Sequence, residues 1–191
     1  MALSDELRAR VVAEFPKYPE KRAVLLTALH WVQAERGGWI PPDTIPDLAE
    51  LLEIPVIEVE EVISFYPMYS VEPVGRWHLQ VCTNLPCCLA GARGLVRALE
   101  HELDICAGEV SEDGMFSLRE TECLGSCGTA PVLQVNNEPY VECLTEGGLV
   151  DLIARLRARA AAADAAQTAS KTGASGTLAP GAARPLNGGG S

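Results

Sequence analysis

Long apolar runs are missing from this sequence. No stretch approaches the roughly 18 consecutive apolar residues that a membrane-spanning helix requires. The first residues, MALSDELRAR, lack the apolar core of a signal peptide, and their acidic residues are untypical of a transit peptide. We therefore expect a cytoplasmic protein, in which thiols stay reduced and clustered cysteines more often bind metal than form disulfides.

Basic residues are also scarce. The chain has 15 Lys and Arg residues against 26 Asp and Glu residues, and its net charge at pH 7 is −11. Binding to a phosphate backbone depends on clustered Lys and Arg side chains, so this composition argues against a nucleic-acid partner. The sequence has no G-x-G-x-x-G motif after an expected strand and no set of acid, base and nucleophile. We expect neither a dinucleotide-binding site nor a complete active site on this chain.

The apolar residues of the first 72 positions follow a helical period. They predict four short helices over residues 3–15, 21–38, 41–54 and 55–66, separated by glycine or proline. Four aromatic residues of this bundle belong either to its core, which is the preferred prediction, or to an exposed patch that holds a partner protein. These residues are Trp31, Trp39, Phe65 and Tyr66.

From residue 73 the pattern changes to alternating strands and helices. Residues 76–82 and 114–123 predict strands, and residues 131–143 predict a hairpin with its turn at Asn136-Asn137. Helical spacing returns over residues 89–104 and 145–159. This order predicts an α/β layer arrangement of thioredoxin-like size.

Together these patterns predict an α+β protein with three parts. Residues 1–72 form an N-terminal helical bundle, and residues 73–157 form the thioredoxin-like domain. Residues 158–191 are rich in Ala, Gly, Ser, Thr and Pro and have few apolar anchors. We expect this last part to be a low-complexity, disordered tail.

Five of the seven cysteines gather in two stretches, VCTNLPCC (81–88) and ECLGSC (122–127). Each stretch follows an expected strand, so the two can present thiolates at one end of the sheet. Spacings of C-x4-C and C-x3-C could supply the four thiolates of a [2Fe–2S] cluster, two for each iron. Zinc is the alternative, although structural zinc sites favour closer C-x2-C pairs, and buried cysteines without a ligand role are the third reading. The choice between the adjacent Cys87 and Cys88 stays open at this point.

Four stretches together resemble one family: YPEKRAVLLTALHWVQAERGGWI, FYPMYSVEPVGRWHLQVC, CTNLPC and ECLGSCGTAP. Over residues 10–155 the chain is similar to the small thioredoxin-like [2Fe–2S] subunit of NADH:quinone oxidoreductase, respiratory complex I. The resemblance implies one [2Fe–2S] cluster and selects Cys87 rather than Cys88 as a ligand. Departures from the family occur at Thr129, where it often has Asn or Tyr, and in the tail. The ligands carried over are Cys82, Cys87, Cys123 and Cys127.

The same resemblance implies a redox subunit without a complete active site of its own. Its cluster exchanges electrons with the FMN of a larger flavoprotein subunit, which also binds NADH. It implies a bacterial complex I-type assembly, with this chain on the cytoplasmic side of the inner membrane through partner subunits and not inserted in the membrane. The equivalent subunit of an NAD-linked hydrogenase or formate dehydrogenase is the alternative.

One alternative from another class is an iron–sulfur or zinc regulator of transcription. TIPDLAELLEIPVIEVEEVISF fits a helix-turn-helix pattern. Its second helix, however, carries Glu58, Glu60 and Glu61 and no basic residue, which is unfavourable beside phosphates.

Three cysteines and the three histidines remain outside this scheme. We expect Cys88, Cys106 and Cys143 to be small buried residues rather than ligands, with a weak S–H hydrogen bond from Cys88 to the cluster as the alternative. The histidines lie in helical or strand patterns and are expected to be structural. They are His30, His78 and His101.

Overall fold

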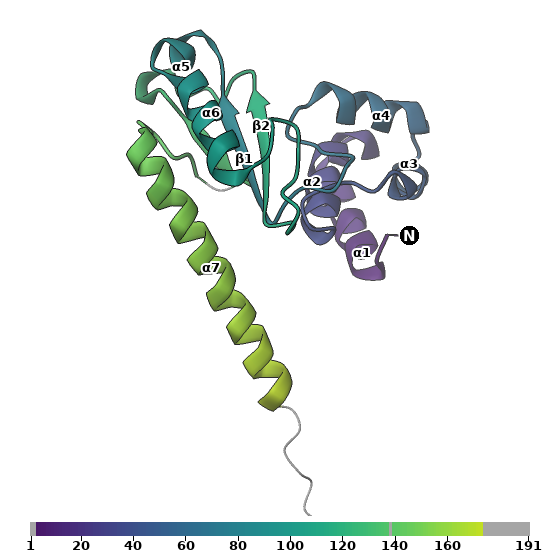
Figure 1. The fold of residues 1–191 in the computed structure, drawn as a ribbon. Coiled ribbons are helices and arrows are strands. Elements are labelled where there is room, and N and C mark those ends of the chain that lie inside the picture. Colours follow the sequence, from purple (N-terminus) through teal and green to yellow (C-terminus); the bar gives the residue numbers. More distant parts are fainter. Residues whose placement is uncertain (1–2, 138, 174–191) are drawn as a thin grey trace, which may run out of the picture. The chain divides into compact units, whose positions relative to one another are not determined.

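The computed structural model describes residues 3–137 and 139–173, and the chain divides into two compact units, Met1–Val150 and the segment from Asp151 onwards. The first unit contains a group of helices followed by a small sheet with its own helices, which is the α+β architecture that the sequence predicts (Figure 1). The predicted boundary between residues 72 and 73 remains a prediction.

Four α-helices and three short 3-10 segments make up the first region. They enclose one apolar core in which Val11, Leu29 and Val59 are fully buried. The Ser4 hydroxyl caps the first helix by accepting a hydrogen bond from the Leu7 N–H at 3.1 Å. The four predicted helices are thereby confirmed, each shorter than expected. They are α1 (Asp5–Glu14), α2 (Leu25–Glu35), α3 (Ile45–Leu52) and α4 (Val56–Phe65), with 3-10 segments at Phe15–Lys17, Lys21–Val24 and Pro42–Thr44.

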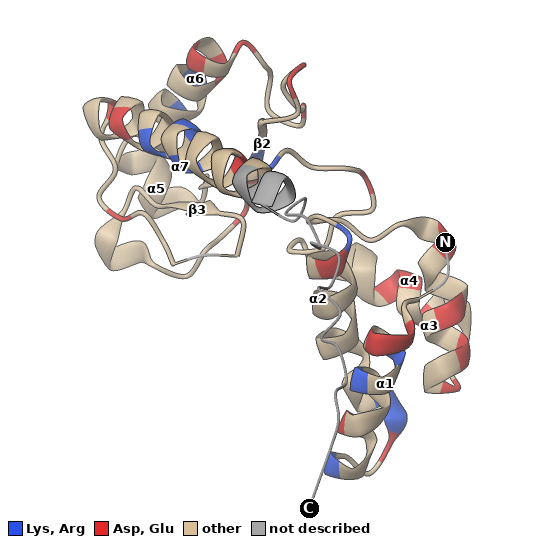
Figure 2. Cartoon of the chain, turned by 90° about the horizontal axis from the view of Figure 1, so that it is seen from below, with Lys and Arg blue, Asp and Glu red and all other residues tan. Residues whose placement is uncertain are grey.

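Acidic residues gather on α3 and α4, as the red segments of Figure 2 show. Residues 37–75 contain no Lys or Arg. Two contacts reach this surface from the basic residues before α2: Lys21 pairs with Glu53, and Arg22 Nε lies 3.3 Å from the Glu58 carboxylate. The outer surface of α4 therefore has the wrong charge for a recognition helix on DNA.

The sheet has three strands in the order β2–β1–β3: β1 is Trp77–Cys82, β2 is Phe116–Thr121 and β3 is Leu133–Val135. β1 pairs with β2 in parallel and with β3 antiparallel. After β3 the chain turns at Asn136-Asn137, and Val141 returns to form one antiparallel bridge with Leu133. The predicted hairpin thus has its expected turn, but its second arm is a single bridge.

Two helices connect β1 to β2, where the sequence predicts one. α5 (Leu85–Leu89) is a short helix capped by the Asn84 side chain, which accepts a hydrogen bond from the Leu85 N–H at 2.8 Å. α6 (Ala92–Leu103) contacts β1 and β2 and buries Leu95, Leu99 and Leu103. The prediction missed α5 because five residues including a proline show no helical period.

The two faces of the sheet differ in chemistry because successive side chains of a strand point to opposite sides. One face carries Leu79, Val81 and Leu118, which are buried with the apolar side of α6. The other face is polar although much of it is buried. Its buried polar residues are Gln80, Ser117 and Thr121, and Cys82 follows them in the same alternation.

α7 spans Glu146–Gly173, so helix covers residues for which the sequence predicts a disordered tail. That prediction is wrong for residues 158–173. The segment RAAAADAAQ is rich in alanine, which has the highest helix propensity, and this preference does not need apolar anchors. The rest of the predicted tail, residues 174–191, lies outside the described residues. Neither α7 nor any other described helix is long and apolar enough to cross a membrane.

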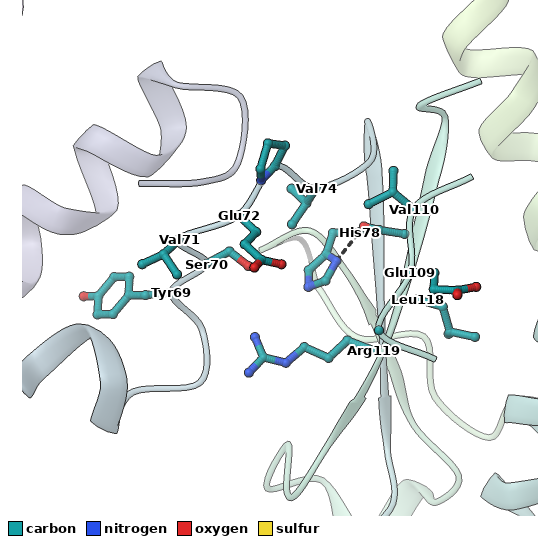
Figure 3. A pocket seen from close by; sticks show the side chains of 13 residues that line it. Tyr69, Ser70, Val71, Glu72, Val74, His78, Glu109, Val110, Leu118 and Arg119 are labelled. Carbon is teal, nitrogen blue, oxygen red and sulfur yellow. Dashed lines mark hydrogen bonds between the residues drawn. The ribbon is translucent and has the colours of Figure 1, made fainter. Parts of the chain in front are cut away.

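A cavity of about 280 Å³ lies beside the start of β1, between the segment 69–74 and the strands (Figure 3). The Ser117 hydroxyl accepts a hydrogen bond from the Gly75 N–H at 3.0 Å and lies 2.7 Å from His78 Nδ1. The Ser117 hydroxyl can donate to Nδ1 or accept from it, according to the tautomer of the imidazole. Burial, with a smaller contribution from the positive charge of Arg119, lowers the pKa of His78 to about 4. The prediction that His78 has a structural role remains a prediction.

Gly75 is the point of closest backbone approach to β2. A Cβ atom there would lie 2.3 Å from the Phe116 carbonyl carbon and 2.6 Å from the Ser117 nitrogen. We expect Gly75→Ala to lower the free energy of unfolding by about 1–3 kcal/mol, because backbone atoms must move. Gly147→Ala is the matched control, since a Cβ there meets nothing within 4 Å. Urea denaturation followed by circular dichroism measures both, and equal stability of the two variants would contradict the prediction.

His78 makes folding stability depend on pH. Its pKa is about 4 in the folded chain against the ordinary value of 6.5, so between these values the unfolded chain binds a proton that the folded chain does not. Stability is therefore complete above pH 6.5 and falls by up to about 3 kcal/mol as the pH drops to 4. Thermal unfolding at pH 7.5 and pH 5 should show a smaller difference in His78→Asn than in the natural chain. The same difference in both chains would show that His78 does not titrate as described.

Candidate metal centre

Four cysteines approach one another at the carboxyl end of the sheet. Cys82 is the last residue of β1, and Cys123 follows the end of β2 by two residues. Because β1 and β2 are parallel, both chain segments leave the sheet at the same edge. Cys87 lies on α5, and Cys127 begins the 3-10 segment Cys127–Thr129.

The contacts among these thiols centre on Cys82. The thiols of Cys87 and Cys123 both form hydrogen bonds with the Cys82 sulfur, and Cys127 is close enough to Cys87 to interact with it electrostatically. The structure thus brings together the two pairs that are distant in sequence. Among residues 3–137 and 139–173, no three His, Cys, Asp or Glu side chains are grouped to hold a single metal ion. A [2Fe–2S] cluster, by comparison, takes its four thiolates two on each iron.

The four thiols differ in exposure. Cys82 and Cys87 are 3% and 2% exposed, whereas Cys123 and Cys127 are exposed to solvent. The site therefore lies at the surface of the protein. Its buried side is formed by Cys82 and Cys87, and its solvent side by Cys123 and Cys127.

Backbone N–H groups favour the ionised form of Cys82. Burial opposes its ionisation, but hydrogen bonds from the N–H groups of Asn84 and Leu124 and from the thiols of Cys87 and Cys123 hold the pKa of Cys82 below its ordinary value. Burial raises the pKa of Cys87, and its hydrogen bond to Cys82 raises it further. Cys82 is therefore the thiol of this buried pair that ionises first, and ionised thiols are the form that binds metal.

Two other thiols of the site also accept backbone hydrogen bonds. The Val132 N–H donates to Cys87, and the Gly125 N–H donates to the Cys123 sulfur at 3.3 Å. Gly125 has a φ of 76°, a left-handed conformation that favours glycine. Such N–H groups stabilise negative charge on sulfur and are one of the means by which proteins set cluster potentials.

A buried hydroxyl at the same edge tests whether these residues fit an iron–sulfur cluster. Thr121 Oγ1 has no hydrogen-bond partner within the described part of the chain. Thr121 is the register partner of Cys82 on β2 and lies two residues before Cys123. A buried hydroxyl without an acceptor is costly, and cluster sulfurs are acceptors, so the residues fit a cluster at this place. Sequence patterns do not identify Thr121, because only the strand register brings it beside Cys82.

The surplus cysteines do not all follow their prediction. Cys88 is half-buried, and its thiol donates to the Thr83 carbonyl at 3.0 Å. Cys106 and Cys143 are exposed, so the prediction that they are buried is wrong. Both lie beyond the end of a regular element, where alternation no longer places a side chain in the core: Cys106 follows α6, and Cys143 lies two residues after the Val141 bridge.

Comparison with known proteins bears on the family to which the chain belongs. Residues 11–157 match the family model described as thioredoxin-like [2Fe–2S] ferredoxin. The chain is 48% identical over 160 residues to NADH-quinone oxidoreductase subunit 2 of Thermus thermophilus. The aligned region covers 83% of this chain and 88% of the relative. It is 42% identical over 143 residues to a subunit of the NADH-quinone oxidoreductase of Rickettsia bellii, covering 74% and 85% of the two chains.

Among solved structures, the chain is similar to NAD⁺-reducing [NiFe]-hydrogenase in its air-oxidised state. The TM-score is 0.60 at 22% sequence identity, and the match covers 71% of this chain and 23% of the hydrogenase chain. The chain thus spans about a quarter of that larger chain, and the likeness concerns the fold. The resemblance predicted from the sequence is confirmed: this chain belongs to the thioredoxin-like [2Fe–2S] ferredoxin family.

Proposed function

We propose that this chain carries one [2Fe–2S] cluster and acts as an electron-transfer subunit of an NADH:quinone oxidoreductase. The observation that carries the proposal is the approach of two cysteine pairs, distant in sequence, at one edge of the sheet. The family match and the named relatives support it. The proposed ligands are Cys82, Cys87, Cys123 and Cys127.

When bound, the cluster supplies one-electron redox chemistry, and the residues of this chain position it and modify its charge balance. Cys82 and Cys87 would hold it from the buried side, and Cys123 and Cys127 from the side open to solvent. The backbone N–H groups directed at the sulfurs offset their negative charge. The exposed side leaves a short path for electrons between the cluster and a docked redox partner.

The electron donor in this proposal is the FMN of a partner subunit that also binds NADH. The two relatives are named as subunits of NADH-quinone oxidoreductase, and this sequence has no G-x-G-x-x-G motif of its own. Leu85 and Leu89 of α5 are 68% and 81% exposed and lie on either side of Cys87, which makes an apolar rim beside the site. Exposed apolar side chains beside a redox site suit a docking surface.

The aromatic residues of the helical region support a second contact with a partner. Phe65, at the end of α4, is 78% exposed. Trp31 and Tyr66 are half-buried and pack against the helical core, and Trp39 is also half-buried. Trp31 and Tyr66 therefore agree with the preferred prediction of a core position, whereas Phe65 is exposed and can contact a partner. Within such an assembly the chain would lie on the cytoplasmic side of a bacterial inner membrane through its partners.

The equivalent subunit of an NAD-linked hydrogenase is the second candidate. The fold likeness to NAD⁺-reducing [NiFe]-hydrogenase favours it, but at 22% identity against 48% for the Thermus thermophilus relative. A transcription regulator is disfavoured by the acidic surface of α4 (Figure 2).

Adjacent cysteines give the sharpest test of the ligand set. Electron paramagnetic resonance of the purified chain should show a signal from one unpaired electron only after reduction by dithionite. Cys87→Ser should lower the amount of signal with the natural line shape by about tenfold or more, because a cluster ligand is lost. Cys88→Ser should retain it, because that thiol donates to the Thr83 carbonyl. Zinc without iron, or equal effects of the two substitutions, would contradict the proposal.

The apolar rim generates a second test. Leu89→Asp places a charge on the rim, and we expect it to weaken retention of the flavoprotein by about tenfold, the effect of losing one well-packed interface residue. Bound FMN for each chain, measured after affinity purification of the whole complex, reports retention. Val150→Asp is the matched control, since Val150 is an exposed apolar residue elsewhere. Both variants should keep the cluster signal, and equal FMN content in the two would contradict a docking role for the rim.

A further inference from the structure

Thr121 differs from the other buried polar residues on the polar face of the sheet in its hydrogen bonding. Its side chain is only 7% exposed, and its hydroxyl has no partner within the described part of the chain. The other buried polar side chains of this face are paired: Gln80 Nε2 donates to the Asn136 carbonyl at 2.8 Å, and the Ser117 hydroxyl contacts His78 Nδ1 at 2.7 Å. The absence of a protein partner is therefore specific to the position nearest the cysteines.

The strand register places Thr121 beside two of the four cysteines. β1 and β2 pair in parallel with Cys82 opposite Thr121, and the Thr83 N–H donates to the Thr121 carbonyl at 2.9 Å. Register partners on adjacent strands project from the same face of a sheet. Cys123 comes two residues after Thr121, and its thiol forms a hydrogen bond with the Cys82 sulfur. The Thr121 side chain thus lies on the same face of the sheet as Cys82, at the edge where the four cysteines gather.

Burial of a hydroxyl without a hydrogen-bond partner is unfavourable, so such a group normally indicates an acceptor. The chemistry of the neighbouring groups limits what that acceptor can be. The Cys82 sulfur accepts hydrogen bonds from two backbone N–H groups, those of Asn84 and Leu124. Donors of this kind stabilise negatively charged sulfur, and the sulfurs of an iron–sulfur cluster carry negative charge.

We propose that the Thr121 hydroxyl donates a hydrogen bond to a sulfur of the cluster and thereby raises the reduction potential of the cluster. This inference rests on the proposed function. Reduction adds one electron and one negative charge and breaks no bond. A donor directed at the cluster stabilises the more negative, reduced state more strongly, which raises the potential.

Three substitutions test the hydroxyl in the full-length chain with its cluster. Thr121→Val keeps the shape and removes the donor, and Thr121→Ser keeps the donor. Thr83→Val makes the same chemical change at the residue next to Cys82. In a redox titration followed by electron paramagnetic resonance, Thr121→Val should lower the ratio of reduced to oxidised cluster about tenfold at the natural midpoint, a shift of about 59 mV. Thr121→Ser and Thr83→Val should keep the natural midpoint.

A second measurement separates a hydrogen bond from a change in packing. Electron–nuclear double resonance of the reduced chain should show one proton coupling that is present in H₂O and is lost on exchange into ²H₂O. Thr121→Val should lack this exchangeable coupling, and Thr121→Ser should keep it. If Thr121→Val does not load a cluster, Thr121→Ala removes the donor with a smaller side chain. A loaded cluster with unchanged midpoint and unchanged coupling in the donor-free variant would overturn this inference alone. Failure of the natural chain to bind iron would overturn the proposed function together with it.

Discussion

The parallel pairing of β1 with β2 is the constraint on which the candidate site depends. Because both strands run in the same direction, the segments that follow them leave at one edge and carry Cys82 and Cys123 with them. A slip of the register by one residue would turn every side chain of β2 to the opposite face. Gly75 contributes to this pairing, since only a residue without a Cβ fits against the backbone at the start of β2.

Much of the architecture could be predicted because it depends on local patterns. Helical spacing located the four N-terminal helices, and alternation located β1 and β2 to within a few residues. The helix over residues 158–173 could not be predicted from apolar periodicity, because alanine forms helix through backbone propensity alone. The same method missed α5, where an Asn84 cap and a proline set the conformation.

The candidate site was predictable as a set of residues but not as an environment. The spacing of the cysteines and the family resemblance selected Cys82, Cys87, Cys123 and Cys127. Neither could identify the N–H donors or the contribution of Thr121, since these come from strand register and loop conformation. The prediction that Cys106 and Cys143 are buried was wrong for a related reason. Neither residue belongs to a helix or strand whose period fixes the direction of its side chain.

The unequal exposure of the two cysteine pairs bears on how a cofactor reaches this protein. Cys82 and Cys87 lie on β1 and α5 and are buried, whereas Cys123 and Cys127, in the loop and the 3-10 segment after β2, are exposed. A cluster delivered to the folded chain would therefore enter from the solvent side, where Cys123 and Cys127 are exposed. The same opening exposes the cluster to chelators and oxidants until a partner subunit covers it.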